Sequence, residues 1–193
     1  ISGGDGNDQI FGGAGNDVID KMAGHDFVDA GDGDDIIQWN DTTGDLVHGG
    51  NGNDRIIGGD MAADEIHGDA GNDFIQAFTT SAANATVGDK LFGGDGNDTI
   101  IGGNGADRID GGAGNDTLTG NGGADIFTFQ ASQGGHDAIT DFNVNSDMIN
   151  LSGFGSNFDP MAHLHDTAGG AVLDLGAAGQ VTLEGIHAAD LSQ

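Results

Sequence analysis

The sequence predicts an all-β solenoid, in which short strands stack along one axis, followed by a β-rich C-terminal cap. Three observations support this prediction: a nine-residue repeat, an apolar residue at one fixed position of the repeat, and an unusual composition. The chain has 193 residues, of which 39 are Gly, and a formal net charge of -28. Its Gly content is far above the usual share of about 7%. All of the acidic residues except Glu65 and Glu184 are Asp.

The repeat reads G-G-x-G-x-D-x-U-x, where U is a large apolar residue. It is clearest at residues 3–11 (GGDGNDQIF), 12–20 (GGAGNDVID) and 93–101 (GGDGNDTII). Thirteen units lie between Gly3 and Thr128, and their sixth-position residues are Asp8, Asp17, Asp26, Asp35, Asp45, Asp54, Asp64, Asp73, Asp89, Asp98, Asp107, Asp116 and Asp125. An apolar residue follows two positions after every one of them. A fixed period of this length is the signature of a solenoid.

Each unit divides into a turn and a strand. Positions 1 to 6 are turn residues, because Gly tolerates positive φ and close backbone approach. Positions 7 to 9 form a three-residue strand, in which alternation places position 8 on one face and its neighbours on the other. Since position 8 is always apolar, it faces inward, and two units make one coil of a flattened solenoid.

Such a thin core does not hold the chain together by itself. One buried aliphatic side chain in each unit contributes about 2 kcal/mol, and ordering nine residues costs more than that. The close aspartates also repel one another. A hard divalent cation solves both problems, since Ca²⁺ takes carboxylate and carbonyl oxygens as ligands. The sequence therefore predicts calcium sites in the turns.

The nonapeptide resembles the RTX (repeat-in-toxin) repeat of secreted bacterial proteins over residues 1–128. The resemblance implies a right-handed parallel β-roll in which Ca²⁺ lies between unit n and unit n+2, on one edge of the roll. It implies ligation by the Asp side chain and by carbonyls of the first four turn positions, with about six to eight ions and at most eleven. The turn glycines so implicated are Gly4, Gly6, Gly13, Gly15, Gly31, Gly33, Gly50, Gly52, Gly94, Gly96, Gly103, Gly105, Gly112 and Gly114.

The two edges of the roll differ in sequence. The even-numbered units follow the consensus closely and define a regular edge, where five calcium sites are expected between successive members of the series Asp17, Asp35, Asp54, Asp73, Asp98 and Asp116. The odd-numbered units define an irregular edge, because four consecutive odd units, from the third to the ninth, are degenerate and every insertion precedes or lies in an odd unit. Its best expected site joins Asp107 and Asp125, and weaker candidates join Asp89 with Asp107 and Asp8 with Asp26.

Two interpretations of the irregular edge stay open. In the first, its sequence has drifted where calcium is dispensable. In the second, the edge is a partner surface that displays Trp39, His48, Met61, His67 and the loop of Phe78.

Residues 129–193 are expected to form a separate cap at the end of the roll. Their apolar segments predict antiparallel strands near 126–129, 138–142, 148–151, 171–175 and 181–183, and residues 188–191 predict a short final helix. The stretch DAITDFNVNSDMINLSGF is similar to the C-terminal flanking segment of RTX proteins, including serralysin-type metalloproteases. That resemblance implies an uncleaved type I secretion signal. We also expect further residues after Gln193 and domains before Ile1.

Other functional classes find no support in the sequence. The acidic chain would be repelled by nucleic-acid phosphates, and no apolar run reaches the ~18 residues of a membrane span. There is no Cys, no HExxH, no G-x-S-x-G and no P-loop lysine motif. His163 and His165 have no third metal ligand nearby and are expected to be surface residues. His48 and His67, at position 9 of successive odd units, should stack about 4.8 Å apart on the exterior.

These observations predict a non-catalytic calcium-binding module that folds on Ca²⁺ binding outside the bacterial cell. It would stabilise an upstream domain and support secretion by the type I machinery. One alternative is a recognition module for acidic polysaccharides that uses the irregular edge and Trp39. A second alternative is the C-terminal half of a secreted metalloprotease.

Overall fold

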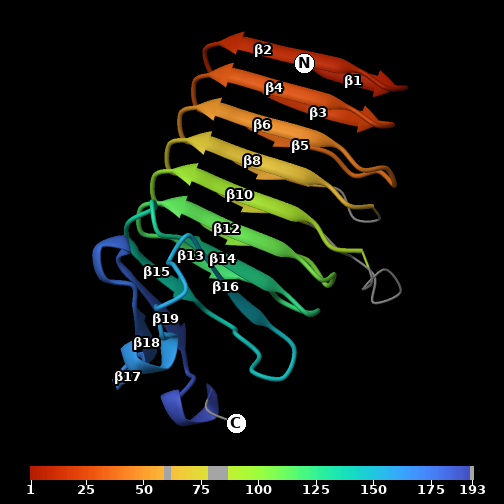
Figure 1. The fold of residues 1–193 in the computed structure, drawn as a ribbon. Helices are drawn as coiled ribbons and strands as arrows, with labels where there is room; N and C mark the ends of the chain where they lie inside the picture. Colours follow the sequence, from red (N-terminus) through yellow and green to blue (C-terminus); the bar gives the residue numbers. More distant parts are fainter. Residues whose placement is uncertain (59–61, 78–86, 192–193) are drawn as a thin grey trace.

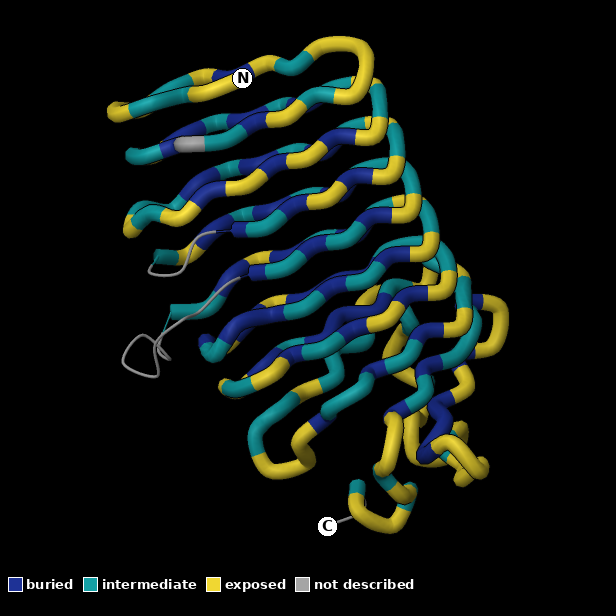
Figure 2. Tube along the Cα trace, turned by 180° about the vertical axis from the view of Figure 1, so that it is seen from behind, coloured by how far each residue is buried: buried dark blue, intermediate teal, exposed yellow. Residues whose placement is uncertain are grey.

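The computed structural model describes residues 1–58, 62–77 and 87–191, and it confirms the all-β parallel solenoid. The coils stack in chain order from the N-terminus, with two sheets facing each other across a narrow interior (Figure 1). Burial alternates along the strands, so that buried and exposed residues follow one another on each coil (Figure 2).

One sheet has eight strands that pair in parallel throughout, in the order β16-β14-β12-β10-β8-β6-β4-β2. Its strands are β2 (Gln9–Ala14), β4 (Phe27–Asp32), β6 (Leu46–Asn51), β8 (Glu65–Ala70), β10 (Lys90–Asp95), β12 (Arg108–Ala113), β14 (Ile126–Gln130) and β16 (Met148–Ser152). Most of them have six residues, twice the expected three, because each continues through the first three positions of the next unit. The first three positions of each turn on the regular edge, including their glycines, therefore belong to the end of a strand.

The other sheet has eleven strands in the order β1-β3-β5-β7-β9-β11-β13-β15-β19-β18-β17. Those of the roll are β1 (Ser2–Asp5), β3 (Val18–Ala23), β5 (Ile36–Gln38), β7 (Arg55–Ile57), β9 (Phe74–Gln76), β11 (Thr99–Ile101), β13 (Thr117–Thr119) and β15 (His136–Ile139). From β5 to β13 these strands have the three residues that the repeat predicts.

The core consists of two stacked columns of position-8 side chains, one from each sheet. All thirteen predicted residues are buried: Ile10, Ile19, Val28, Ile37, Val47, Ile56, Ile66, Ile75, Leu91, Ile100, Ile109, Leu118 and Phe127. The strand pairing keeps each column in register even across the longest connection, where Leu91 pairs with Ile66 and Ile100 with Ile75. Because a one-residue slip would turn every side chain over, burial of the columns specifies the register.

The first insertion of the irregular edge contributes to the core and not to the surface. Trp39 follows β5 directly and is only 5% exposed. A side chain at Gly58, in the next coil, would meet the Trp39 ring, so Gly58 leaves the space that the indole fills. The expectation that Trp39 is displayed to a partner is therefore wrong. Met61 and Phe78 lie outside the described residues.

The C-terminal part corrects the expectation of antiparallel strands after the repeats. β14 pairs in parallel with β12, β15 pairs in parallel with β13, and β16 pairs in parallel with β14. The parallel coils thus continue past residue 128, where the consensus ends. Antiparallel pairing begins with β17 (Leu164–Thr167), β18 (Gly170–Asp174) and β19 (Gln180–Glu184), and β19 also pairs in parallel with β15.

The last strands close the end of the eleven-stranded sheet. Leu183 of β19 is fully buried opposite Ile139 and so extends the core column by one more rung. Three 3₁₀ helices complete this region: η2 (Pro160–His163), η3 (Gly176–Ala178) and the expected final helix, η4 (Ala188–Leu191). No helix among the described residues is long and apolar enough to span a membrane.

Two neighbouring isoleucines test the importance of the columns. Ile37 is fully buried, whereas Ile36 is 42% exposed on the same strand. Ile37→Ala should lower the stability of the calcium-loaded chain by about 3 kcal/mol, and Ile36→Ala by less than about 1 kcal/mol. Denaturant unfolding followed by circular dichroism measures both values. Equal losses from the two variants would contradict the assignment of the core.

Candidate metal centre in the turns

The structure gathers the sixth-position aspartates into two rows, one along each edge of the roll. The row on the regular edge runs through Asp17, Asp35, Asp54, Asp73, Asp98 and Asp116, and the row on the irregular edge runs through Asp8, Asp26, Asp45, Asp64, Asp89, Asp107 and Asp125. From Asp26 onward every member is buried. Eleven of the thirteen short acidic side chains are thus withdrawn from water, each just before a strand of the core.

One carboxylate oxygen of each buried aspartate is satisfied by the chain itself. Along the regular edge, the Asp35 N–H donates to Oδ1 of Asp54, and the Asp54 N–H donates to Oδ1 of Asp73, at 2.8 and 2.7 Å. Along the irregular edge, the Asp45 N–H donates in the same way to Oδ1 of Asp64 at 2.8 Å. This hydrogen bond links each coil to the next on both edges.

The second carboxylate oxygen is buried without a hydrogen-bond donor in most of these residues. Among the described residues this applies to Oδ2 of Asp8, Asp26, Asp35, Asp45, Asp54, Asp73, Asp98, Asp116 and Asp125. A buried and unpaired carboxylate oxygen is costly, because it has lost its hydration and gained nothing in return. Each of these atoms needs either a proton or a cation.

The electrostatics of the rows lead to the same conclusion. From Asp26 onward, burial raises the pKa of the carboxyl groups in both rows, the ladder hydrogen bond lowers it in part, and neighbouring carboxylates raise it further in most of them. The pKa rises to about 8 for Asp64, to about 7 for Asp45, Asp98, Asp107 and Asp125, and to about 6 for Asp54, Asp73, Asp89 and Asp116. Ionised carboxylates at these positions therefore need a compensating positive charge.

The first Gly of a turn leaves room beside the unpaired oxygen. A Cβ atom at Gly49 would collide with Oδ2 of Asp54 and lie 2.9 Å from the carbonyl oxygen of Gly68, in the next coil. A Cβ atom at Gly93 would likewise collide with Oδ2 of Asp98 and with the carbonyl oxygen of Gly111. The space is lined by one carboxylate oxygen and one carbonyl oxygen from adjacent coils. This oxygen donor set fits Ca²⁺, which prefers carboxylates and carbonyls.

The turn glycines of the regular edge share one backbone conformation. Gly13, Gly15, Gly31, Gly33, Gly50, Gly52, Gly94, Gly96, Gly112 and Gly114 all have positive φ, as do Gly4 and Gly6 of the first unit. Positive φ is accessible to Gly at little cost, which explains why Gly recurs at positions 2 and 4. That these residues supply carbonyl ligands stays a prediction, as does the ligand role of each aspartate.

A second ladder, which the sequence reasoning missed, runs along the regular edge at position 5. The Asn72 N–H donates to Oδ1 of Asn53 at 2.8 Å, and the Asn97 N–H donates to Oδ1 of Asn72 at 2.7 Å. The series continues to Asn115 and His136. The repeated Asn-Asp pair of the even units was the available signal. On the irregular edge only the first rung is present, where the His25 N–H donates to Oδ1 of Asn7 at 3.2 Å. From the fifth unit onward this position is held by Gly44, Ala63, Gly88, Ala106 and Ala124, which have no side-chain acceptor.

The expected best site of the irregular edge has a different turn. Gly103 and Gly105 are not among the described residues with positive φ, and the Gly103 N–H donates to Oδ2 of Asp107 at 2.8 Å. Asp107 therefore has both carboxylate oxygens engaged by the chain, unlike Asp125, whose Oδ2 is unpaired. The turn that precedes Asp8 keeps positive φ at Gly4 and Gly6, as on the regular edge.

Both rows extend beyond the repeats that the consensus identifies. The Asp116 N–H donates to Oδ1 of Asp137 at 3.0 Å, and the Asp125 N–H donates to Oδ1 of Asp147 at 3.2 Å. The pKa of Asp137 is raised to about 7, chiefly by burial. The signal was present in the sequence, since Ile139 and Ile149 each follow two residues after the aspartate.

The structure also places the two histidine pairs that the sequence analysis singled out, His48 with His67 and His163 with His165. The rings of His48 and His67 stack with centroids 4.5 Å apart, which confirms the predicted ladder. They lie on the outer face of the eight-stranded sheet, in β6 and β8, and not in the turns. Among the described residues, His163 and His165 belong to no group of three potential metal ligands.

The raised pKa values predict that acid stabilises the metal-free roll. From Asp26 onward, the carboxyl groups of the rows have a higher pKa in the folded chain than the ordinary value of 3.8, so the folded state binds protons more tightly. This stabilisation is complete below about pH 4 and is lost as the pH rises through about 6 to about 8. In chelator, the β signal in circular dichroism should therefore increase from about pH 8 to about pH 5. A decrease over this interval would contradict the burial of the rows.

Comparison with known proteins agrees with the geometry of the turns. The family model of the RTX calcium-binding nonapeptide repeat matches residues 1–20, 22–38, 39–75 and 92–127, which together make up more than half of the chain. No curated protein matches the sequence.

Among solved structures, the extracellular lipase LipA from Serratia marcescens is similar, with 22% sequence identity and a TM-score of 0.49. The similarity covers 97% of this chain and 39% of the lipase chain, so this chain spans less than half of that protein. The periodic aspartates, the glycine turns and the family match lead to one conclusion: the chain belongs to the family of RTX calcium-binding nonapeptide-repeat proteins.

Proposed function

We propose that the chain is a non-catalytic module whose folding is driven by Ca²⁺ outside the bacterial cell. The observation that supports this proposal is the row of buried Oδ2 atoms without donors, which repeats from coil to coil. At Asp54, Asp73 and Asp98, the unpaired oxygen lies beside a first-position Gly and a carbonyl oxygen of the next coil. When bound there, Ca²⁺ supplies the positive charge and the coordination that the chain itself lacks.

The residues of the roll make folding depend on the ion. Without a cation, closing a turn buries a carboxylate next to the carboxylates of the adjacent coils, which raises its pKa and opposes folding. The position-8 columns contribute too little to offset this cost, because each coil adds only two buried side chains. Binding free energy at such a site is therefore folding free energy. We expect about six to eight ions, most of them on the regular edge.

This dependence on calcium suits a protein that is exported before it folds. Weak extracellular modules bind Ca²⁺ at roughly 10⁻⁴ to 10⁻³ M, so the chain would stay unfolded at cytosolic calcium concentrations. It would pass through the type I secretion machinery in that state and fold outside the cell. The folded roll would then stabilise a domain that precedes it in the parent protein.

The alternative of a polysaccharide-recognition module is weakened by the position of Trp39. Trp39 was the expected stacking platform for a polysaccharide, but it is buried in the core. The metalloprotease alternative would place the catalytic centre in another part of a longer parent protein, because this chain has no HExxH motif. No described feature favours either alternative over the calcium module.

Folding on calcium binding is tested directly by far-UV circular dichroism. In chelator at neutral pH, the 193-residue chain should show the spectrum of a largely unfolded chain. Millimolar Ca²⁺ should produce a β spectrum, whereas the same concentration of Mg²⁺ should not, because Mg²⁺ demands a tighter octahedral geometry. A β spectrum of equal strength in chelator and in Ca²⁺ would rule out the proposal.

The assignment to the regular edge is tested by a matched pair of variants. Asp73 and Asp64 are both buried, and each accepts a ladder hydrogen bond on Oδ1. Asp73→Asn should lower the number of bound ions by about one to two, since its carboxylate lies between two turns. Asp64→Asn should leave that number unchanged. Equilibrium dialysis with calcium analysis measures both, and an equal loss in the two variants would contradict the preference for the regular edge.

A further inference from the structure

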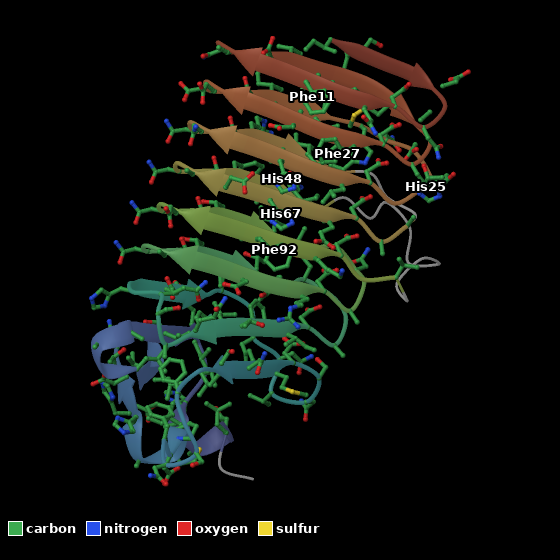
Figure 3. The ribbon with its side chains drawn as sticks, turned by 45° about the horizontal axis from the view of Figure 1, so that its top comes forward. Phe11, His25, Phe27, His48, His67 and Phe92 are labelled. Atoms are coloured by element: carbon green, nitrogen blue, oxygen red, sulfur yellow. The ribbon has the colours of Figure 1, made fainter. Side chains whose placement is uncertain are left out.

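Four side chains on the outer face of the eight-stranded sheet form a group that the calcium rows do not use. Glu65, His67 and Asp69 occupy alternate positions of β8, so all three point outward. His48 of β6 pairs directly with His67 across the two strands. In Figure 3, His48 and His67 lie in the middle of a column that also contains Phe11, Phe27 and Phe92.

The contacts within this group bring three potential metal ligands together. His48 Nδ1 lies 2.9 Å from Oδ2 of Asp69, and the two imidazole rings are stacked at an interplanar angle of 11°. One ligand atom from each of His48, His67 and Asp69 lies within 4.8 Å of the others. The side chains of His48 and Asp69 are 31% and 39% exposed, so an ion can reach them from solvent.

The backbone of Asp69 is a second and independent observation. Asp69 stands at position 2 of its unit, where the paired strands have Gly13, Gly31, Gly50, Gly94 and Gly112. It has φ of 73°, in the left-handed region that those glycines adopt without strain. A side chain at this position thus costs conformational free energy, and strain of this kind concentrates at functional sites.

Glu65 supports His67 from the other side. Its Oε1 lies 3.4 Å from Nε2 of His67, and its Oε2 accepts a hydrogen bond from Lys90 at 2.7 Å. A carboxylate that holds one imidazole nitrogen leaves the other nitrogen free for a metal and fixes the ring orientation. In this arrangement Nδ1 is the nitrogen of His67 that is left to bind an ion.

We propose that His48, His67 and Asp69 bind a divalent transition-metal ion such as Zn²⁺, with Glu65 positioning His67. Imidazole and carboxylate ligands suit zinc, copper and nickel, whereas Ca²⁺ prefers oxygen ligands, so this site differs in selectivity from the turns. The ion takes the place of the contact between His48 Nδ1 and Asp69 Oδ2, and any proton on Nδ1 moves to Nε2 or is released to solvent. Three protein ligands leave a further position for water or for an external ligand.

The rearrangement that this site requires is small. Zinc bonds of about 2.1 Å in a tetrahedral arrangement place the ligand atoms about 3.4 Å apart. The ligand atoms now lie within 4.8 Å of one another. Rotation of side chains on the two adjacent strands brings them to the shorter separation. The strands themselves stay in register, because His48 and His67 are already paired.

Calorimetric titration of Zn²⁺ into the 193-residue chain tests the proposal, with millimolar Ca²⁺ present to keep the roll folded and its turns occupied. One equivalent of Zn²⁺ should bind. His48→Gln and His67→Gln should each weaken binding by about tenfold or more. His165→Gln, in the exposed β17, is the control and should leave the affinity unchanged.

Asp69→Gly separates metal binding from folding. It restores the residue found at this position in the neighbouring coils, so the thermal midpoint of the calcium-loaded chain should not fall. The affinity for Zn²⁺ should nevertheless fall by about tenfold or more. The proposal is overturned if wild type binds no Zn²⁺ under these conditions, or if the affinity is unchanged in His48→Gln or in Asp69→Gly. Loss of binding in His165→Gln, with none in His48→Gln, would place the ion elsewhere and also overturn it.

Discussion

The fold depends on one constraint, the burial of a carboxylate in the turns at both edges of the coil. The chain satisfies only half of that group: Oδ1 accepts a backbone N–H from the neighbouring coil, and Oδ2 commonly has no donor. A single coil adds two buried apolar side chains, which is too little to offset the desolvation of two charges. We therefore propose that the roll is a metal-dependent stack, in which each coil is stable only when its turns are neutralised.

This constraint also explains the composition of the turns. A first-position Gly, where present, leaves open the space beside the carboxylate that a Cβ atom would fill, as at Gly93 and Asp98. The fourth unit has Ala30 at this position. The glycines at positions 2 and 4 allow the backbone to turn with positive φ. On the regular edge the Asn ladder adds a further bond between coils. Asp107, with Oδ2 bonded to the Gly103 amide, shows how a turn on the irregular edge satisfies its carboxylate by other means.

Because the turns and the apolar columns specify the backbone, the outer faces of the sheets tolerate many residue types. The outward positions of the eight-stranded sheet carry Phe, His, Asp, Glu and Lys without a change in strand register. A functional group can therefore be built there from side chains on adjacent coils, held at strand spacing by the roll. The group of His48, His67 and Asp69 uses this property and places its Asp at a position that otherwise favours Gly.

The sequence by itself determined the solenoid, the inward face of each strand and the two rows of aspartates, because all three follow from a period that is local in the chain. The stacking of His48 on His67 followed as well, since equal positions in successive coils must be neighbours.

Only the tertiary structure decided what depends on contacts between distant segments. Trp39 is buried because Gly58 of the next coil leaves room for it. β15 pairs in parallel with β13, and β16 with β14, although the glycine consensus has ended. There Asp137 and Asp147 accept the ladder hydrogen bonds of the preceding coils. The side chain of Asp69 meets His48 because the two strands are in register, a contact that no motif along one strand contains.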